Sequence, residues 1–171
     1  MSDVLSSGFY SEIIISVIEL WEVIMGDEVH VLLEFSEGFS GSGITDSGYQ
    51  IRIGADGAVP YDLLLMGLGS CLYATFLEIL GKKKISFTST KIEVSGEKRR
   101  EIPTTLESCF ITVIIVGTDK SHWKSVEKSF ELATKYCSIY KTISGVAEIN
   151  WEVSFVDLSF VRKAGCYEEN G

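Results

Sequence analysis

The run from Leu63 to Leu80 restricts the possible fold more than any other part of the sequence. Its eighteen residues, LLLMGLGSCLYATFLEIL, contain a single charged side chain, Glu78. Pro60 before the run suits the first turn of a helix, and Gly81 with the three lysines after it suits a helix C-terminus. A helix that is apolar on every side needs protein around it, so we expect this helix at the centre of the structure with cover on both sides.

The same run has nearly the length of a membrane span, and the lysines after it resemble a positively charged flank. At 1.5 Å per residue it would extend about 27 Å, with Glu78 inside the hydrocarbon region. Strand-like segments follow it directly, and no second run of this kind occurs. We therefore expect a buried helix of a soluble protein and no membrane span.

Hydrophobic periodicity divides the rest of the chain into short elements. Spacings typical of amphipathic helices occur at residues 10–25 and 119–137, and strand-like segments occur at 29–35, 39–44, 49–53, 85–98, 104–116 and 147–157. On the strand 104–116, Cys109, Ile111, Val113 and Ile115 share one face. This order predicts an α+β fold with a mainly antiparallel sheet. We expect an N-terminal helical extension (1–27), one domain (28–157) and a C-terminal tail (158–171).

Charge and composition exclude several classes of function. Fifteen Lys and Arg against twenty-four Asp and Glu give a net charge of −9, which would repel a nucleic-acid backbone. Only His30 and His122 are available for imidazole chemistry, and no cysteine spacing matches a zinc site, so we expect no metal. Met1 is followed by Ser2 and Asp3 rather than by a basic segment, which favours a cytoplasmic protein.

In a reducing compartment the four cysteines are either inert or chemically active. Cys109 lies on an aliphatic strand face and Cys166 in a charged tail, whereas Cys71 and Cys137 lie on inward faces of predicted helices. Packed helices could bring these two sulfurs into disulfide range. If another helix begins at Ser138, its first amides would lower the pKa of the Cys137 thiol. Periodicity alone leaves open a redox pair or two buried thiols.

Two segments resemble the cysteine motifs of a known superfamily. PYDLLLMGLGSC at 60–71 is similar to its proline-led, leucine-rich helix with a small-small-Cys ending, and ATKYCS at 133–138 to its second, Lys-Tyr-Cys-like motif. The superfamily is that of the osmotically inducible protein C and the organic hydroperoxide resistance proteins (OsmC/Ohr). The resemblance covers about residues 29–157. It implies an intertwined homodimer in which sheets wrap around two central helices per subunit, with the active sites at the subunit boundary.

The resemblance also implies peroxidase chemistry on organic hydroperoxides, as in a stress response. Cys71 would be the attacking thiolate and Cys137 the thiol that closes a disulfide, which an external dithiol reopens without a bound cofactor. Because Cys71 lies too deep in its helix for the dipole to help, a nearby cation should lower its pKa. Arg52 is our candidate for that cation, and Asp62 is the acidic residue nearest the position of the family's glutamate.

The expected substrate pocket is apolar, which favours hydrophobic hydroperoxides and other small hydrophobic ligands. Its predicted lining consists of Tyr61, Leu64, Leu68, Leu72 and Phe76.

The sequence differs from the peroxidase members at three points, which keeps a second function open. Tyr61 stands where they have glutamate, Ser138 where many have proline, and no arginine precedes Arg52. The alternative is a non-enzymatic OsmC-like dimer that senses redox state or binds a small ligand in the same pocket.

Overall fold

The computed structural model describes residues 29–157. The predicted helix at 10–25 and Cys166 lie outside the described residues. The described chain divides between Ala58 and Val59 into two compact units, so the domain expected at 28–157 comprises both.

The first unit is a three-stranded antiparallel sheet. Its strands are β1 (Val31–Phe35), β2 (Ser40–Thr45) and β3 (Gln50–Gly54), in that order. Gly38 and Gly48, with φ of 78° and 83°, occupy the turns between them, where a residue without Cβ adopts the left-handed region at least cost. The strands expected at 29–35, 39–44 and 49–53 are confirmed.

The two faces of this sheet differ in polarity. Cross-strand partners share a face, so Leu33 and Phe35 lie on the same face as Ile51 and Ile53, with Gly43 and Gly41 between them. Leu33 is 52% exposed and Phe35 49%. Three short strands cannot bury an apolar face by themselves. This face, which we call the apolar face of β1–β3, therefore requires cover from other protein.

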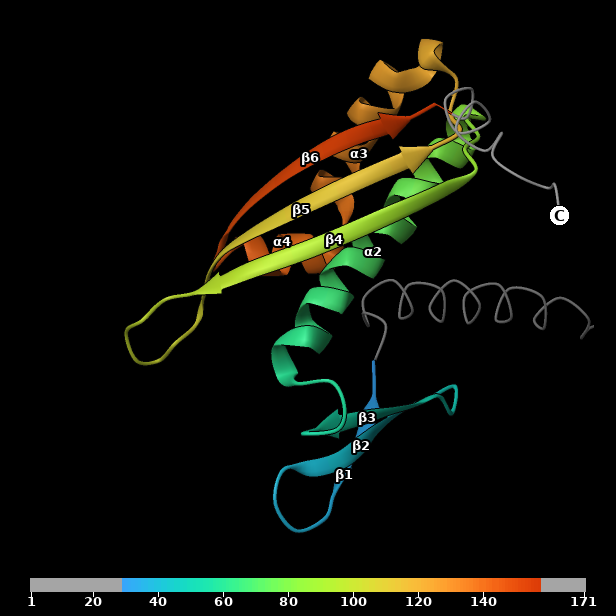
Figure 1. Ribbon diagram of the computed structural model, residues 1–171. Helices are drawn as coiled ribbons and strands as arrows, with labels where there is room; N and C mark the ends of the chain where they lie inside the picture. The colour runs from blue at the N-terminus through green and yellow to red at the C-terminus, as the bar shows by residue number, and fades with distance from the viewer. Residues whose placement is uncertain (1–28, 158–171) are drawn as a thin grey trace, which may run out of the picture. The chain divides into compact units, whose positions relative to one another are not determined.

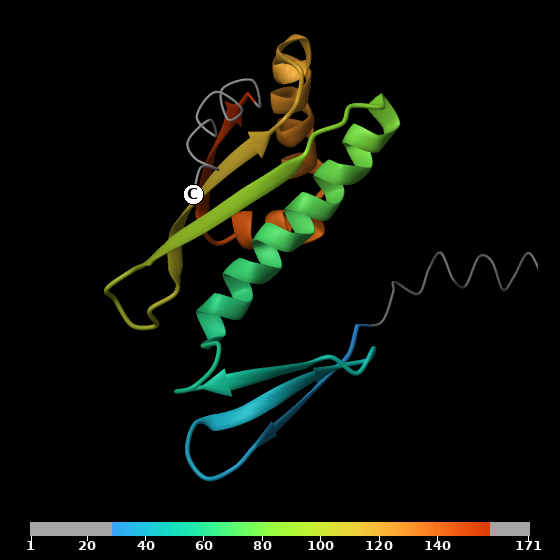
Figure 2. The same ribbon diagram turned by 45° about the vertical axis from the view of Figure 1, so that its right-hand side comes forward.

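The second unit packs three helices on one face of a second sheet, as Figures 1 and 2 show. The sheet order is β4 (Ser89–Lys98), β5 (Leu106–Val116) and β6 (Glu148–Val156), with β5 in the centre. The helices are α2 (Pro60–Lys83), α3 (Trp123–Tyr136) and α4 (Ser138–Ser144). Mixed helices and sheets of this kind confirm the α+β class.

The pair β5–β6 is parallel, whereas the other strand pairs are antiparallel. The chain leaves the end of β5, passes through α3 and α4 on the helical face, and enters β6 in the direction of β5 (Figure 1). A helical crossover is the connection that parallel neighbours need. The sheets are thus mainly antiparallel, as predicted, with one parallel pair that the periodicity did not indicate.

The core of this unit lies between α2, α3 and the sheet. Leu68, Leu72, Phe76 and Leu80, four residues apart on α2, are buried. The predicted apolar face of β5 is confirmed, since Cys109, Ile111, Val113 and Ile115 are buried. Other apolar side chains of α2 are not: Met66 is 63% exposed. Within the second unit α2 is therefore covered on one stripe rather than on both sides.

α2 ends among the lysines after Gly81, as its sequence indicates. Gly81 continues the helix, and Lys84 takes the left-handed conformation (φ 55°) that closes it. The Lys84 and Ile85 amides donate to the carbonyls of Gly81 and Leu80, at 3.1 Å each. By length and composition, α2 is the one helix in the described part that could cross a membrane. Its buried side chains belong to the core of this unit, so α2 is the core helix here.

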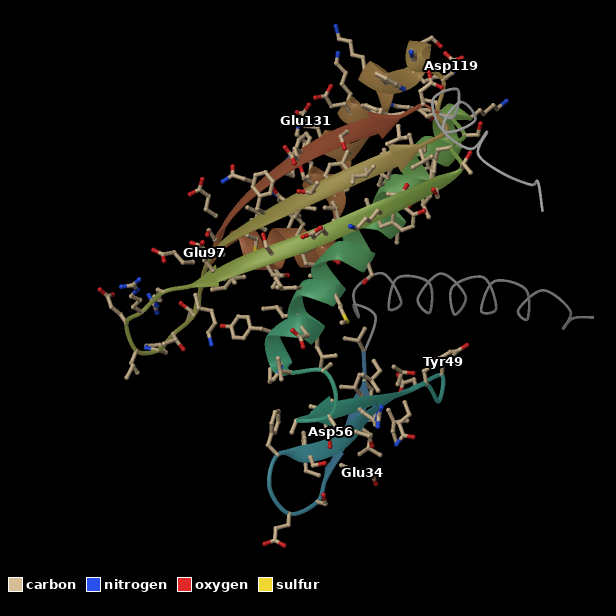
Figure 3. The ribbon with its side chains drawn as sticks, viewed as in Figure 1. Glu34, Tyr49, Asp56, Glu97, Asp119 and Glu131 are labelled. Atoms are coloured by element: carbon tan, nitrogen blue, oxygen red, sulfur yellow. The ribbon has the colours of Figure 1, made fainter. Side chains whose placement is uncertain are left out.

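The predicted helix at 119–137 is confirmed, with a break at its end. Asp119 accepts a hydrogen bond from the Ser121 amide (2.8 Å) before a 3₁₀ turn, and α3 follows. Figure 3 shows Asp119 where the chain enters this turn and Glu131 on α3 itself. Glu131 pairs with Lys135 at 2.9 Å on an exposed position, whereas Phe130 beside it is fully buried.

We expect Phe130→Ala to lower the free energy of unfolding by about 3–5 kcal/mol, because it removes a ring packed edge-on against both Phe76 and Trp151 and leaves a cavity. Chemical denaturation measures this change. Tyr136→Ala is the matched control on the same helix, since that ring is 72% exposed. Equal losses for the two variants would contradict the assignment of the core.

Candidate redox site

Two cysteines from distant parts of the sequence lie in direct contact. The Cys137 thiol donates a hydrogen bond to the Cys71 sulfur, with 3.1 Å between the two Sγ atoms. Cys71 lies in the middle of α2, on the side that meets α4, and is partly exposed. Cys137 is fully buried. An external reagent can therefore reach the first sulfur more readily than the second.

The break between α3 and α4 sets the position of Cys137. Its backbone is extended (φ −67°, ψ 118°), so it ends α3 and begins α4. Its amide donates to the Ala133 carbonyl at 2.8 Å, and its sulfur accepts from the Tyr140 amide at 3.4 Å. The sulfur thus takes the place that an oxygen usually has in a helix cap.

Hydrogen bonds at the start of α4 lower the pKa of the Cys71 thiol. Burial acts to raise this pKa, but the Ile139 amide, the Cys137 thiol, and the hydroxyl and amide of Ser138 together outweigh it. The Ser138 Oγ lies 3.9 Å from the Cys71 sulfur. Each group favours the thiolate because it donates toward the negative charge. All of these donors are neutral, so the lowering does not depend on the cation that we expected.

The pKa of the Cys137 thiol is raised instead. Burial is the largest cause, and the neighbouring Cys71 adds to it, while the Tyr140 and Ile139 amides act in the opposite direction. We expected the first amides of α4 to lower the pKa of Cys137. The amides do act in that direction, but burial of Cys137 outweighs them and the net shift of its pKa is upward. The site therefore holds one thiolate-prone sulfur beside one that stays a thiol.

Asp62 and Tyr61 lie in the first turn of α2 and have structural contacts there. The Asp62 carboxylate accepts from the Val59 amide at 3.0 Å, as an acidic residue in a first turn commonly does. The Tyr61 hydroxyl donates to the Thr104 carbonyl at 3.3 Å, and the Lys98 ammonium lies 4.4 Å from the centre of its ring. Asp62 therefore caps the start of α2, and Tyr61 ties that start to the β4–β5 connection.

Three of the five predicted pocket residues belong to the core instead. Leu68, Leu72 and Phe76 are fully buried in the second unit. A cavity of about 560 Å³ lies on another face of α2, against β4, with Asp62, Met66 and Tyr73 on one wall and Thr90, Ile92 and Val94 on the other. Neither cysteine lines it. Periodicity identified the apolar side chains correctly but could not separate those that pack inward from those that face a cavity.

Arg52 lies on β3 in the first unit, whereas both cysteines belong to the second. The strand register puts it on the face of the sheet that carries Ser42 and Glu34, opposite the apolar face of β1–β3. Its role as a partner of the Cys71 thiolate stays a prediction.

Sequence reasoning missed Ser138 and Ile139 as contributors to the site. The signal was present, because a helix that restarts directly after a cysteine turns its first amides toward that end. The sequence pattern predicts an effect of those amides on Cys137, whereas in the structure they also act on the sulfur of the neighbouring helix. Among residues 29–157, no group of three or more His, Cys, Asp or Glu side chains could hold a metal ion.

This combination of fold and facing cysteines defines a class of protein. Residues 53–152 match the family model described as OsmC-like protein. Both cysteine-bearing helices fall within that range. The chain therefore belongs to the OsmC family.

The chain is also similar to individual proteins, two of them with solved structures that share this fold. A hypothetical protein of Aquifex aeolicus VF5 is 30% identical, with a TM-score of 0.65 over 77% of this chain and 99% of that one. An organic hydroperoxide resistance protein OsmC of Legionella pneumophila, 14% identical, has a TM-score of 0.59 over 76% of this chain and 98% of its own. Protein YhfA of Escherichia coli K12 is 27% identical over 112 residues, which are 63% of this chain and 83% of that protein.

We expect Cys71 to react with iodoacetamide at a lower pH than an ordinary thiol, because its lowered pKa leaves more thiolate at neutral pH. Ser138→Ala removes one donor and Ser138→Pro removes the hydroxyl and the amide hydrogen. The midpoint of the rate against pH should therefore rise from wild type to alanine to proline. Peptide mass spectrometry separates the four cysteines.

Proline at position 138 should not disturb α4, because it would occupy the first helical position after an extended residue. A circular dichroism spectrum equal to that of wild type checks this. Identical midpoints in all three proteins would contradict the hydrogen-bond account of Cys71.

Proposed function

We propose that this protein is a thiol-dependent peroxidase that reduces organic hydroperoxides through Cys71 and Cys137. The observation that carries the proposal is the 3.1 Å contact between a partly exposed sulfur of lowered pKa and a buried one of raised pKa. A thiolate is the nucleophile that attacks peroxides, and its sulfenic acid needs a second thiol nearby before it oxidises further. Cys71 has the exposure and the lowered pKa that a nucleophile requires. Cys137 has the burial and the raised pKa of a thiol that reacts second.

The proposed reaction has three steps. The Cys71 thiolate attacks the terminal oxygen of ROOH, the O–O bond breaks, and the alkoxide takes a proton from water to leave as ROH. The resulting Cys71 sulfenic acid reacts with the Cys137 thiol to form a disulfide and release water. An external dithiol, itself oxidised to a disulfide, returns both cysteines to thiols by exchange. A reducing compartment such as the cytoplasm would supply that dithiol.

Family membership and the names of structural relatives support this chemistry. The Legionella protein is called an organic hydroperoxide resistance protein, and its fold is shared by this chain. A non-enzymatic redox sensor with the same cysteines is the second candidate. The groups of the second unit that lower the pKa of the Cys71 thiol are all neutral, which favours this candidate. Steady-state turnover distinguishes the two functions.

The decisive experiment measures cumene hydroperoxide reduction with a dithiol as the electron donor. We expect Cys71→Ser to lose activity by about a hundredfold or more, because the serine hydroxyl is not ionised at neutral pH. Cys137→Ser should leave Cys71 open to sulfinic acid formation, which mass spectrometry detects as two added oxygens. Cys109→Ala should retain activity, since burial raises the pKa of that thiol and it lies on β5.

Activity equal to wild type in Cys71→Ser would refute the peroxidase proposal. A disulfide that forms reversibly in wild type without turnover would support the sensor instead.

A homodimer is the assembly that this function would use. The apolar face of β1–β3 and the exposed Met66, Leu64 and Leu77 of α2 are apolar surfaces that a second copy of the chain would cover.

We expect Leu33→Asp to convert the dimer to monomer, because it adds a charge to the apolar face of β1–β3. Analytical ultracentrifugation measures the mass. Gln50→Glu is the control, since it adds one negative charge on the opposite face of the same sheet. A monomeric wild-type protein, or two variants that dissociate equally, would contradict the proposed interface.

A further inference from the structure

α2 and α3 run in opposite directions along their contact, as Figure 2 also shows. Cys71 in the middle of α2 meets Cys137, the residue that ends α3. Lys83 at the end of α2 reaches Ser129, which lies eight residues before Cys137. The two helices are therefore joined by two polar contacts, one at the cysteine pair and one near the other end of their contact.

The second polar contact holds the Lys83 ammonium at one point of α3. The ammonium donates to the Ser129 hydroxyl at 2.8 Å and to the Ser125 carbonyl at 3.5 Å. The Ser129 hydroxyl in turn donates to the same Ser125 carbonyl at 2.7 Å. We call this arrangement of Lys83, Ser125 and Ser129 the Lys83 clamp.

Ser129 is an unusual residue for its position. It is fully buried next to Phe130, whose ring lies 5.5 Å from that of Phe76 across the helix contact. Burial of a hydroxyl costs free energy unless the group is hydrogen-bonded, so packing alone would favour alanine here. Apolar layers can shift past one another with small losses, whereas a buried polar contact forms in one register only. The Lys83 clamp therefore specifies where α3 lies along α2.

The lengths of the two helical segments agree with such a register. Lys83 is twelve residues beyond Cys71, or about 18 Å along the axis of α2, and Cys137 is eight residues beyond Ser129, or about 12 Å along α3. The difference of about 6 Å is within reach of a lysine side chain, which points back toward the start of its helix and hence toward Cys71. A shift of α3 by one residue, about 1.5 Å, would move both contacts together.

We propose that Lys83 is a positioning residue for the cysteine pair, because the clamp fixes α3 along α2 and so holds Cys137 against the Cys71 sulfur. A displacement of about 1 Å is enough to slow a reaction between oriented groups severely. Lys83 itself takes no part in bond formation. The inference rests on the proposed function for its consequence, since rapid closure of the disulfide protects the Cys71 sulfenic acid from further oxidation.

The equilibrium of the cysteine pair with glutathione measures this positioning without peroxide turnover. Each disulfide that forms between Cys71 and Cys137 consumes one oxidised glutathione and releases two reduced ones, so the equilibrium constant is the effective concentration of one thiol at the other. Peptide mass spectrometry separates this disulfide from any that involves another cysteine.

We expect Lys83→Met to lower this effective concentration about three- to tenfold, because methionine keeps an apolar stem and lacks the donor of the clamp. Ser129→Ala removes the acceptor from the other helix and should lower it by a similar factor. The double variant should lose no more than either single variant, since both changes break the same contact.

Two further variants separate the clamp from a general effect of charge. Lys82→Met makes the same substitution one residue earlier, where the lysine is exposed and pairs with Glu78 on its own helix at 2.6 Å. It should behave as wild type. Lys83→Arg retains donors at the end of a long side chain and should lie closer to wild type than Lys83→Met does.

The rate of Cys71 alkylation by iodoacetamide against pH gives a readout that a loss of overall stability would not change. The amides of Ser138 and Ile139, which donate toward the Cys71 sulfur, follow the end of α3. In Lys83→Met they should lie less favourably, and the midpoint of the rate should rise. A circular dichroism spectrum equal to that of wild type shows that the variant is folded.

Wild-type glutathione equilibria in both Lys83→Met and Ser129→Ala would overturn the positioning role. Equal losses in Lys83→Met and Lys82→Met, or losses that add in the double variant, would also contradict it. These outcomes are independent of peroxidase activity. If cumene hydroperoxide is reduced and the clamp variants match wild type, only the positioning role fails. If the clamp variants shift the equilibrium and no hydroperoxide is reduced, only the proposed function fails.

Discussion

The burial of α2 is the constraint on which the second unit depends. Its stripe of Leu68, Leu72, Phe76 and Leu80 packs in one core with the inner face of β5 and with α3. Full burial of each such side chain contributes about 1.5–3 kcal/mol to the free energy of folding, so this stripe holds the helix in one orientation about its own axis. In that orientation Cys71 faces the start of α4. A rotation of α2 by one residue, about 100°, would move the sulfur away from Cys137 and expose the stripe to water.

The break between α3 and α4 supplies the other half of the site at little structural cost. A continuous helix would use the amides of Ser138 and Ile139 for its own hydrogen bonds. The extended backbone of Cys137 frees them, and they donate toward the Cys71 sulfur while Tyr140 caps with the Cys137 sulfur. One local departure from helical geometry therefore both positions the buried thiol and stabilises negative charge on its neighbour. Neutral donors achieve this next to the protein core, where a buried cation would itself be costly to desolvate.

Sequence patterns predicted the elements well because each has one dominant periodicity. The apolar run gave α2, alternation gave the inner face of β5, and the spacing that ends in Ala133 and Cys137 gave α3. The cysteine pair was among the interpretations that helix packing allowed. The parallel pairing of β5 and β6 was missed because strand direction depends on where α3 and α4 pass, which periodicity within a strand does not record.

Other differences arise from tertiary context. Gly81 is a common helix terminator, but it continues α2, and the amides of Lys84 and Ile85 close the helix at the lysines that follow. The predicted pocket lining was apolar for a different reason, since Leu68, Leu72 and Phe76 form the core. The direction of the pKa shift at Cys137 also required coordinates, because burial and hydrogen bonding act on that thiol with opposite signs.

The start, the middle and the end of α2 each have a different role. Its N-terminal turn is tied to the β4–β5 connection through Tyr61, its middle carries the reactive sulfur, and its last turn holds two lysines. Cations near a helix C-terminus are favourable in their own right, since they offset the partial negative charge of the last carbonyls. Helix stability alone would therefore retain Lys82 and Lys83. What it does not account for is the seating of the Lys83 ammonium on the buried Ser129 hydroxyl, which joins the end of α2 to α3. That seating orders a long side chain on neutral acceptors, at an entropic cost that the charge-assisted hydrogen bonds to α3 offset.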